Sequence, residues 1–245
     1  PRLQNCFKTP AIVHKPIIVQ GLPESALALK SADWENALPS DIHLAYLPNY
    51  GVVKLRLGGS SDDALALEFA INQQADLLTE ILGNAIVAYD DVPLEVLIGQ
   101  LLIKNGATLA TAESCTGGNI AHQITKVAGS SSYFKGSVVA YSNEVKINVL
   151  GVCSEDIEKF GAVSKEVVEQ MAVGVRRLMK TDFAVATSGI AGPSGGSDEK
   201  PVGTVWIAVS SSTGTVGREF RYGNVRLQNI ERTTQTALLM LKEFI

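Results

Sequence analysis

The stretch Thr111-Ala112-Glu113-Ser114-Cys115-Thr116-Gly117-Gly118 follows a short apolar run and precedes a segment in which apolar residues recur with helical spacing. This pattern predicts a strand that turns directly into a helix. The glycines of such a turn allow a ligand to approach the backbone, and the free N–H groups at the start of the helix favour negative charge. In the alternative interpretation, Thr116 only caps the helix and the glycines only form the turn. These eight residues favour neither interpretation over the other.

Outward from this turn, short apolar segments alternate with amphipathic ones over residues 92 to 245. We expect strands at 108–113, 137–141, 182–187, 202–210 and 216–222, and helices at 92–105, 119–127, 143–150, 154–160, 164–180 and 226–243. This alternation is typical of an α/β fold built as a three-layer α/β/α sandwich. Because the last two strands have no helix between them, we expect a mixed sheet.

Residues 1–90 have a different pattern, which predicts a small α+β domain ahead of the α/β domain at 91–245. We expect a connector or entering strand at 1–12, strands at 14–20, 44–46, 53–57 and 86–89, a helix from residue 24, and a helix whose buried side carries Leu65, Phe69, Ala75, Leu78 and Leu82. The resulting β-α-β-β-α-β domain is KH-like in size, but it lacks the GxxG loop with which KH modules clamp RNA. A spacer or dimerisation role is therefore favoured over nucleic-acid binding.

The composition is that of an ordinary globular chain, with 245 residues, 46% hydrophobic content and a formal net charge of -4. Such a charge argues against a broad basic face for nucleic acid. No apolar run approaches the roughly 20 residues that span a bilayer, and no signal peptide opens the chain. The cysteines and histidines lie at spacings that suit neither disulfides nor a zinc site: Cys6, Cys115, Cys153, His14, His43 and His122. We therefore expect a cytoplasmic protein with no membrane partner, no nucleic-acid partner and no metal.

The segment Tyr141-Ser142-Asn143-Glu144-Val145-Lys146 follows the second expected strand of the α/β domain. Because Ser142 or Asn143 is a natural N-cap, Lys146 falls in the first turn of a helix, where the helix dipole lowers an amine pKa by less than about one unit. A lysine that acts as a base near neutral pH needs roughly 4 kcal/mol of such help, most of which must come from burial. From these residues alone, a solvent-exposed lysine is the simpler expectation.

The segment Ser188-Gly189-Ile190-Ala191-Gly192-Pro193-Ser194-Gly195-Gly196 follows the third expected strand and offers another glycine-rich surface for a phosphate or carbonyl, although a plain long loop fits as well. At the start of the last helix, Arg226 is the candidate clamp for a phosphate or carboxylate. Arg232 lies about 240° away round that helix. Cys115 with His122 is a rival nucleophile and base, but a buried thiol and a surface imidazole are the favoured interpretation.

Five segments in this order resemble the C-terminal domain of the competence-damage-inducible protein A family: TAESCTGG (111–118), AYSNEVK (140–146), GAVS (161–164), SGIAGP (188–193) and KPVGTVW (200–206). The resemblance covers about residues 92 to 245. It implies a nicotinamide-nucleotide amidohydrolase (nicotinamide mononucleotide deamidase) that forms nicotinate mononucleotide and ammonia in pyridine nucleotide salvage, without a metal or other cofactor. It also implies that Ser114 is the nucleophile and Lys146 the general base, with Tyr141 assisting, as in known serine-lysine pairs.

The resemblance further implies that the glycine-rich loops and one arginine hold the nucleotide. The residues concerned are Thr116, Gly117, Gly118, Ser188, Gly189, Ala191, Gly192, Gly203, Thr204 and Arg226. Backbone N–H groups from 116 to 118 are expected to steady the oxyanion. Residues 1–90 resemble, more weakly, the small middle domain of the family, and the start at Pro1 without a methionine suggests a preceding domain. We expect a homodimer; the alternative function is a non-catalytic scaffold that binds a nucleotide or a partner.

Overall fold

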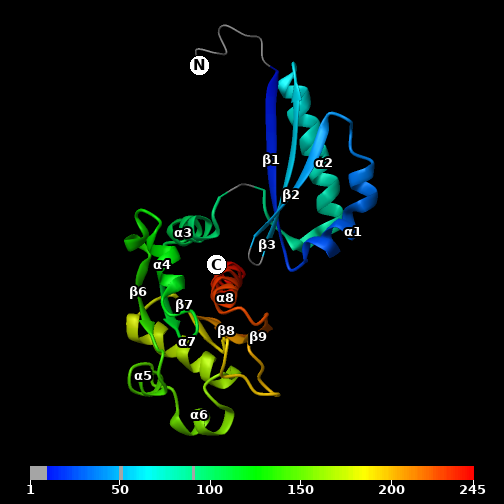
Figure 1. Cartoon of the computed structure of the whole chain (residues 1–245). Helices are drawn as coiled ribbons and strands as arrows, with labels where there is room; N and C mark the ends of the chain where they lie inside the picture. Colours follow the sequence, from blue (N-terminus) through cyan, green and yellow to red (C-terminus); the bar gives the residue numbers. More distant parts are fainter. Residues whose placement is uncertain (1–9, 50–51, 90–91) are drawn as a thin grey trace. The chain divides into compact units, whose positions relative to one another are not determined.

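The structure, a computed structural model, describes residues 10–49, 52–89 and 92–245 (Figure 1). The chain forms two compact units, Pro1–Asp91 and Val92–Ile245, and the hydrophobic clusters of each are its own. The segment expected at 1–12 therefore lies mostly outside the described residues, as do the tip of the expected hairpin and the join at 90–91. Among the described helices, none combines the length and the apolar character that crossing a membrane requires.

The described part of the first unit is a four-stranded antiparallel sheet with helices on one face (Figure 1). Its elements are β1 (Ala11–Gln20), α1 (Glu24–Asn36), β2 (Ile42–Asn49), β3 (Val52–Ser61), α2 (Ala64–Leu82), the short 3-10 helix η1 (Gly83–Ala85) and β4 (Ile86–Ala88). The strand order β2-β3-β1-β4 places β3 and β1 in the centre, and each neighbouring pair is antiparallel. The β-α-β-β-α-β order expected from the sequence is therefore confirmed.

Helix α2 buries a different side from the one expected. Asp63 caps the helix by accepting hydrogen bonds from the N–H groups of Leu65 and Ala66. The buried side chains are Leu67, Ile71, Ala75, Leu78 and Leu82, whereas Leu65 and Phe69 are exposed. The expectation for Leu65 and Phe69 is wrong because each lies two positions before a core residue, which at about 100° per residue places it on the opposite side of the helix.

The second unit contains a five-stranded sheet between layers of helices (Figure 1). Its strands are β5 (Leu109–Glu113), β6 (Phe134–Val139), β7 (Phe183–Gly189), β8 (Thr204–Ser211) and β9 (Gly214–Arg221). Its helices are α3 (Leu94–Lys104), α4 (Asn119–Thr125), the short 3-10 helix η2 (Ser130–Ser132), α5 (Asn143–Asn148), α6 (Ser154–Phe160), α7 (Lys165–Met179) and α8 (Arg226–Lys242). Each expected strand and helix of this unit is present, so the three-layer α/β/α sandwich is confirmed.

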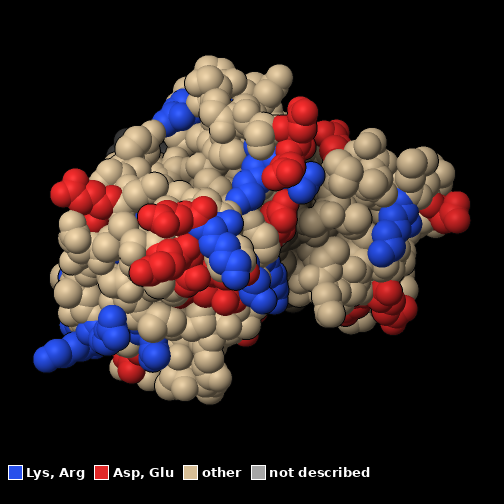
Figure 2. Space-filling view, turned by 90° about the horizontal axis from the view of Figure 1, so that it is seen from below, with Lys and Arg blue, Asp and Glu red and all other residues tan. Residues whose placement is uncertain are grey.

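The sheet of the second unit is mixed, as expected. Its strand order is β6-β5-β7-β8-β9, in which β6, β5 and β7 run parallel and the hairpin of β8 and β9 is antiparallel. The edge strand β9 carries Arg218, Glu219 and Arg221; Arg218 pairs with Glu243, the residue directly after α8, and Arg221 pairs with Glu219. On the face of the molecule seen in Figure 2, basic and acidic side chains are interspersed in the same way.

Alternation along the strands divides the core between the two faces of this sheet. On β5, Leu109 belongs to the cluster that includes residues of α3, α4 and α8, whereas Ala110 and Ala112 belong to the cluster that includes residues of α7. Because β5, β6 and β7 are parallel, their carboxyl ends meet at one edge of the sheet, where open α/β sheets bind ligands. The three loops singled out from the sequence follow these three strands.

Candidate active site

The end of β5 and the first turn of α5 bring Ser114 and Lys146 into contact. The Nζ atom of Lys146 lies 3.2 Å from Oγ of Ser114 and donates a 2.9 Å hydrogen bond to the carbonyl of Ala140. Ser142 caps α5 by accepting a hydrogen bond from the N–H of Val145, which fixes where the helix begins. The nucleophile and the base implied by the resemblance, which lie 32 positions apart in the sequence, therefore meet at the carboxyl edge of the sheet.

Lys146 is buried with only 2% of its surface exposed, and Ser114 beside it is 9% exposed. The expectation of a solvent-exposed lysine is therefore wrong. Burial lowers the pKa of the Lys146 amine from its ordinary value of 10.5, while the nearby Cys115 acts in the opposite direction. Among the residues that the structure describes, no carboxylate forms an ion pair with this amine. A buried amine without such a partner favours its neutral form, which is the form that a general base requires.

The turn after β5 is organised by the carboxylate of Glu113, which is fully buried. Its Oε2 accepts hydrogen bonds from the N–H groups of Gly118 and Ile120, both at 3.0 Å, and its Oε1 accepts one from Ala121 at 2.8 Å. The N–H groups at the start of α4 are therefore satisfied by the protein's own carboxylate, which is also the charge that this end of a helix favours. The sequence-based interpretation that these groups face a ligand does not apply to these three.

The glycines at 117 and 118 are required by the backbone. Gly117 has a φ of +61° and Gly118 a φ of +100°, which is the left-handed region that favours glycine. A Cβ atom on Gly117 would meet no atom within 4 Å, so lack of space is not the reason for this glycine. The N–H of Gly117 donates to the carbonyl of Ser114. Within residues 92–245, no other residue accepts a hydrogen bond from the backbone N–H groups of Cys115 and Thr116, in contrast to those of Gly117 and Gly118, and the N–H of Cys115 contacts only the residue's own thiol.

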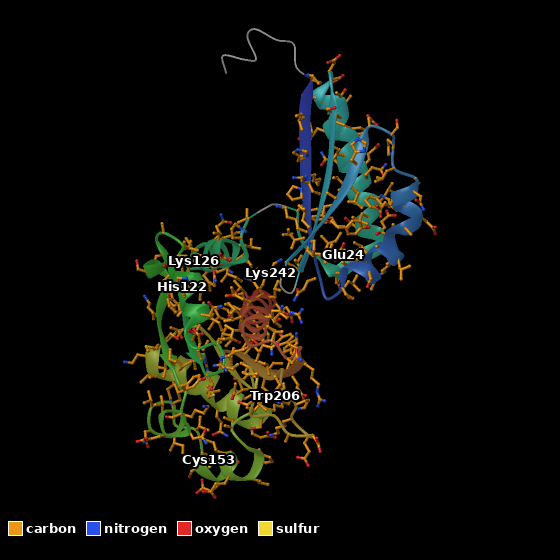
Figure 3. The ribbon with its side chains drawn as sticks, in the orientation of Figure 1. Glu24, His122, Lys126, Cys153, Trp206 and Lys242 are labelled. Carbon is orange, nitrogen blue, oxygen red and sulfur yellow. The ribbon has the colours of Figure 1, made fainter. Side chains whose placement is uncertain are left out.

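Cys115 and His122 lie in different environments. Burial raises the pKa of the Cys115 thiol to about 12, although a hydrogen bond with Thr187 lowers it. His122 is exposed on α4 near Lys126 (Figure 3). The expectation of a buried thiol and a surface imidazole is therefore confirmed. Thr116 does not cap α4, because its hydroxyl instead forms a 2.8 Å hydrogen bond with the hydroxyl of Thr187 on β7.

Tyr141 and Arg226 form a second pair at this edge of the sheet. The hydroxyl of Tyr141, a residue that is 62% exposed, accepts a 2.9 Å hydrogen bond from Nη2 of Arg226. Nη1 of the same arginine donates to the carbonyl of Gly192 at 2.8 Å. Of the two arginines considered on the last helix, it is Arg226 that reaches the loops after β6 and β7. Among the described residues, no three His, Cys, Asp or Glu side chains are grouped so that they could hold a metal ion.

The loop after β7 is packed against the protein's own chain. At the end of β7, the hydroxyl of Ser188 donates to the carbonyl of Ala162 at 2.7 Å, which joins the end of this strand to the segment before α7. A Cβ atom added to Gly189 would lie 2.7 Å from Val205, and one added to Gly192 would lie 2.5 Å from Val202. A Cβ atom added to Gly203 would lie 2.4 Å from the carbonyl of Gly223. These glycines therefore allow close contact between segments of the protein, and their contact with a substrate stays a prediction.

Ala191 and Thr204 are also buried, at 5% and 1% exposure, and the Thr204 hydroxyl has no partner among the described residues. Asn229, which the sequence analysis did not single out, holds this region together. Its Nδ2 atom donates to the carbonyls of Ala191 and Gly223 at 3.0 and 2.9 Å. The same helix also buries Thr233, Thr234 and Thr236, so a polar residue at this position is not a signal that would have identified it from the sequence.

Glu113 is the other residue that sequence reasoning missed, although it stands inside the first motif. The available signal was a carboxylate at the end of an otherwise uncharged strand, directly before a helix start. Such a residue is almost never fully buried unless it is paired or hydrogen-bonded. The N–H groups that bind its carboxylate belong to Gly118, Ile120 and Ala121, which the folded turn brings next to it.

The family model of the CinA C-terminal domain matches residues 91–245, which include Ser114, Lys146, Tyr141 and Arg226. The chain belongs to the CinA family. It is 47% identical over 240 residues to a CinA-like protein from Cytophaga hutchinsonii, covering 98% of this chain and 57% of that protein. It is 45% identical over 242 residues to a CinA-like protein from Flavobacterium psychrophilum, covering 98% and 58%. This CinA chain therefore spans less than two thirds of the length of these curated relatives.

Solved structures of CinA proteins share the fold. The competence/damage inducible protein CihA from Agrobacterium tumefaciens is 40% identical, with a TM-score of 0.59, and the match covers 64% of this chain and 98% of that one. The competence damage-inducible protein A (ComA) from Klebsiella pneumoniae is 37% identical, with a TM-score of 0.60, covering 61% and 93%. These similarities support the α/β architecture of this CinA chain.

Proposed function

We propose that this CinA chain hydrolyses the carboxamide of nicotinamide mononucleotide, giving nicotinate mononucleotide and ammonia, through Ser114 and Lys146. The observation that carries the proposal is the 3.2 Å contact between Lys146 Nζ and Ser114 Oγ in a buried environment. The motifs that resemble the amidohydrolase domain, together with the CinA match over residues 91–245, support the choice of substrate. The proposal concerns the second unit, because the family match covers residues 91–245. It does not extend to the activity of the longer relatives as whole proteins.

The first half of the proposed reaction forms an ester on Ser114. Neutral Lys146 accepts the proton of the Ser114 hydroxyl while Oγ attacks the carboxamide carbon. The charge that develops on the carboxamide oxygen is stabilised by the backbone N–H groups of Cys115 and Thr116, which donate to no other residue within 92–245. The Lys146 ammonium then gives its proton to the amide nitrogen, the C–N bond breaks and ammonia leaves.

The second half hydrolyses this ester. Lys146, neutral again, takes a proton from a water molecule as the water attacks the ester carbon. The bond between that carbon and Ser114 Oγ breaks, and the lysine returns its proton to Oγ, which restores the enzyme. The acid leaves as nicotinate mononucleotide, and the proton of its carboxyl group is taken up by the ammonia released earlier. The hydrogen bond from Nζ to the Ala140 carbonyl keeps the amine directed at the same place throughout.

The phosphate of the nucleotide is proposed to bind Arg226. Two of the five donors of a guanidinium suffice for the hydrogen bonds to Gly192 and Tyr141, which fix its direction. The remaining donors are free to pair with a phosphate, a geometry for which arginine is well suited. In this arrangement Tyr141 assists by orienting the arginine, because no described contact joins it to Ser114 or Lys146.

The test is ammonia release from nicotinamide mononucleotide by the parent protein and by Ser114→Ala. The proposal requires turnover in the parent and its loss in Ser114→Ala. Cys115→Ala, a substitution at the adjacent residue of the same turn, is the matched control and should retain turnover. Equal turnover in Ser114→Ala and the parent would contradict the proposal. A parent that binds the nucleotide but releases no ammonia would support the non-catalytic scaffold instead.

A further inference from the structure

Glu113 is a buried carboxylate without a cationic partner among the described residues. Besides the three backbone N–H groups described above, the hydroxyls of Thr111 and Ser137 donate to its Oε1 at 3.3 and 3.4 Å. Burying an ionised carboxylate is costly even when it is hydrogen-bonded. A serine or aspartate N-cap would satisfy the start of α4 without burying a charge on the strand. The position of this carboxylate therefore calls for an explanation beyond helix capping.

The backbone of Glu113 connects the nucleophile with the base. Its carbonyl accepts a 2.8 Å hydrogen bond from the N–H of Ala140, and the carbonyl of Ala140 accepts the hydrogen bond from Nζ of Lys146. The residue directly after Glu113 is Ser114. One residue thus holds the turn that presents the hydroxyl and, through a single intermediate, the amine beside it.

The side chain of Glu113 also accepts hydrogen bonds from three of the backbone N–H groups of this turn and helix start. Gly118, Ile120 and Ala121 direct their N–H groups at its carboxylate, whereas within residues 92–245 the N–H groups of Cys115 and Thr116 donate to no other residue. We infer that Glu113 is a positioning residue for the proposed reaction: it sets the orientation of Ser114 and leaves these two donors for the oxyanion. The inference rests on the proposed function.

The informative substitution is Glu113→Gln, which keeps the size and shape of the side chain. A carboxamide has a single acceptor oxygen, so its NH2 group must face at least one of the N–H groups that the carboxylate oxygens accept. A buried donor left facing another donor loses its hydrogen bond, and the turn has to shift to relieve this. Displacement of an oxyanion donor lowers kcat by about 10²–10³-fold, whereas binding of the substrate ground state depends less on it.

The matched control is Asn119→Ala. The Nδ2 atom of Asn119 donates to the hydroxyl of Thr234 at 2.9 Å, so this substitution loosens α4 from α8 without touching the carboxylate. Circular dichroism first establishes that both variants and the parent are folded to the same extent, and two readouts are then compared among the three proteins. The first is kcat and KM for nicotinamide mononucleotide. The second is the rate at which a small fluorophosphonate labels Ser114, measured by mass spectrometry, which does not depend on the identity of the substrate.

Glu113→Gln is expected to lower kcat and slow the labelling of Ser114 by at least tenfold each, with KM within about threefold of the parent, while Asn119→Ala stays close to the parent in both. If the two variants behave alike, or if Glu113→Gln labels at the parental rate, the inference is overturned. A parent that releases no ammonia but whose Ser114 labelling depends on Glu113 would reject the proposed function and keep the positioning role.

Discussion

Nη2 of Arg226 lies 2.9 Å from the hydroxyl of Tyr141, so the first residue of the last helix is joined to the loop after β6 across 85 positions of sequence. The same guanidinium is held from the other side by the carbonyl of Gly192. An arginine fixed at two points loses less conformational freedom when it binds a phosphate than a free one does. The pair therefore connects two loops and prepares a site for an anion.

Arg226→Ala is expected to raise KM for nicotinamide mononucleotide by about tenfold or more, because a hydrogen bond to a charged group contributes roughly 1.5–3 kcal/mol. The effect on kcat should be smaller, since phosphate binding is equally present in the ground state and the transition state. Tyr141→Phe removes only the acceptor that orients the arginine, so its KM should lie between those of the parent and Arg226→Ala. Steady-state kinetics on the three proteins check this order. A fall in kcat with unchanged KM in Tyr141→Phe would instead place the phenol in proton transfer.

Lys146→Met is expected to abolish turnover while the protein stays folded. Methionine fills the space of the lysine stem with an apolar chain, so the variant loses the base without leaving a large cavity. General-base catalysis contributes typically about 10²–10⁴-fold, which sets the minimum loss of kcat. Circular dichroism and the ammonia assay on the same preparation make the comparison. Residual activity within tenfold of the parent would remove Lys146 from the reaction.

The dependence on pH follows from the lowered pKa of the Lys146 amine. Because the neutral amine is the active form, kcat/KM should rise with pH, pass through that lowered pKa and level off below the ordinary value of 10.5. A flat profile, or one that rises only near 10.5, would count against the proposed base.

Stability gives an independent measure of the same shift. Between the lowered pKa and 10.5, the Lys146 amine binds fewer protons in the folded protein than in the unfolded chain. Stability of the parent relative to Lys146→Met should therefore increase as pH rises through that interval, and the added stability should be lost again as pH falls through the lowered pKa. Urea unfolding of both proteins at several pH values measures the difference. A difference that does not change with pH would mean that the amine titrates alike in the folded and unfolded states.

Cys115→Ala is expected to retain turnover within a few-fold of the parent. With a thiol pKa of about 12, raised by burial, Cys115 is protonated at neutral pH and cannot act as a nucleophile. Replacing the buried thiol should lower stability by only about 1 kcal/mol, because little volume is removed. Iodoacetamide should alkylate this residue slowly in the native parent and readily after unfolding. Rapid native alkylation coupled to loss of activity would revive the cysteine as a candidate.

The core side of α2 is tested by two alanine substitutions in the same turn. Leu67→Ala should lower the free energy of unfolding of the first unit by about 2–5 kcal/mol, because Leu67 is 2% exposed. Leu65→Ala should change it by less than about 0.5 kcal/mol, because Leu65 is 79% exposed. Trp34 lies in the first unit and Trp206 in the second, so fluorescence in a Trp206→Phe background follows the first unit. Equal effects at both positions would contradict the observed face.

The order of strands and helices was predictable because each element has its own period of apolar residues. The α/β sandwich, the mixed sheet and the β-α-β-β-α-β order all follow from that local pattern. The burial of Lys146 was not predictable locally, because a helix of six residues can turn either side to the sheet. The prediction of the buried side of α2 was wrong for a related reason, since Leu65 and Phe69 are four residues apart, as are the core residues Leu67 and Ile71. The burial of Glu113 was not predictable either, because the N–H groups that bind its carboxylate belong to residues after the turn and meet it only in the folded chain.

The row of charges on β9 has a consequence for how the molecule behaves in a crowded solution. An edge strand with unpaired backbone N–H and C=O groups can form β-sheet hydrogen bonds with a strand of another chain. Arg218, Glu219 and Arg221 place both signs along that border, so a second copy laid alongside would have to bury or oppose them. These charges should thus disfavour edge-to-edge pairing of two copies along β9. Replacing them by neutral residues should make the protein more prone to aggregate.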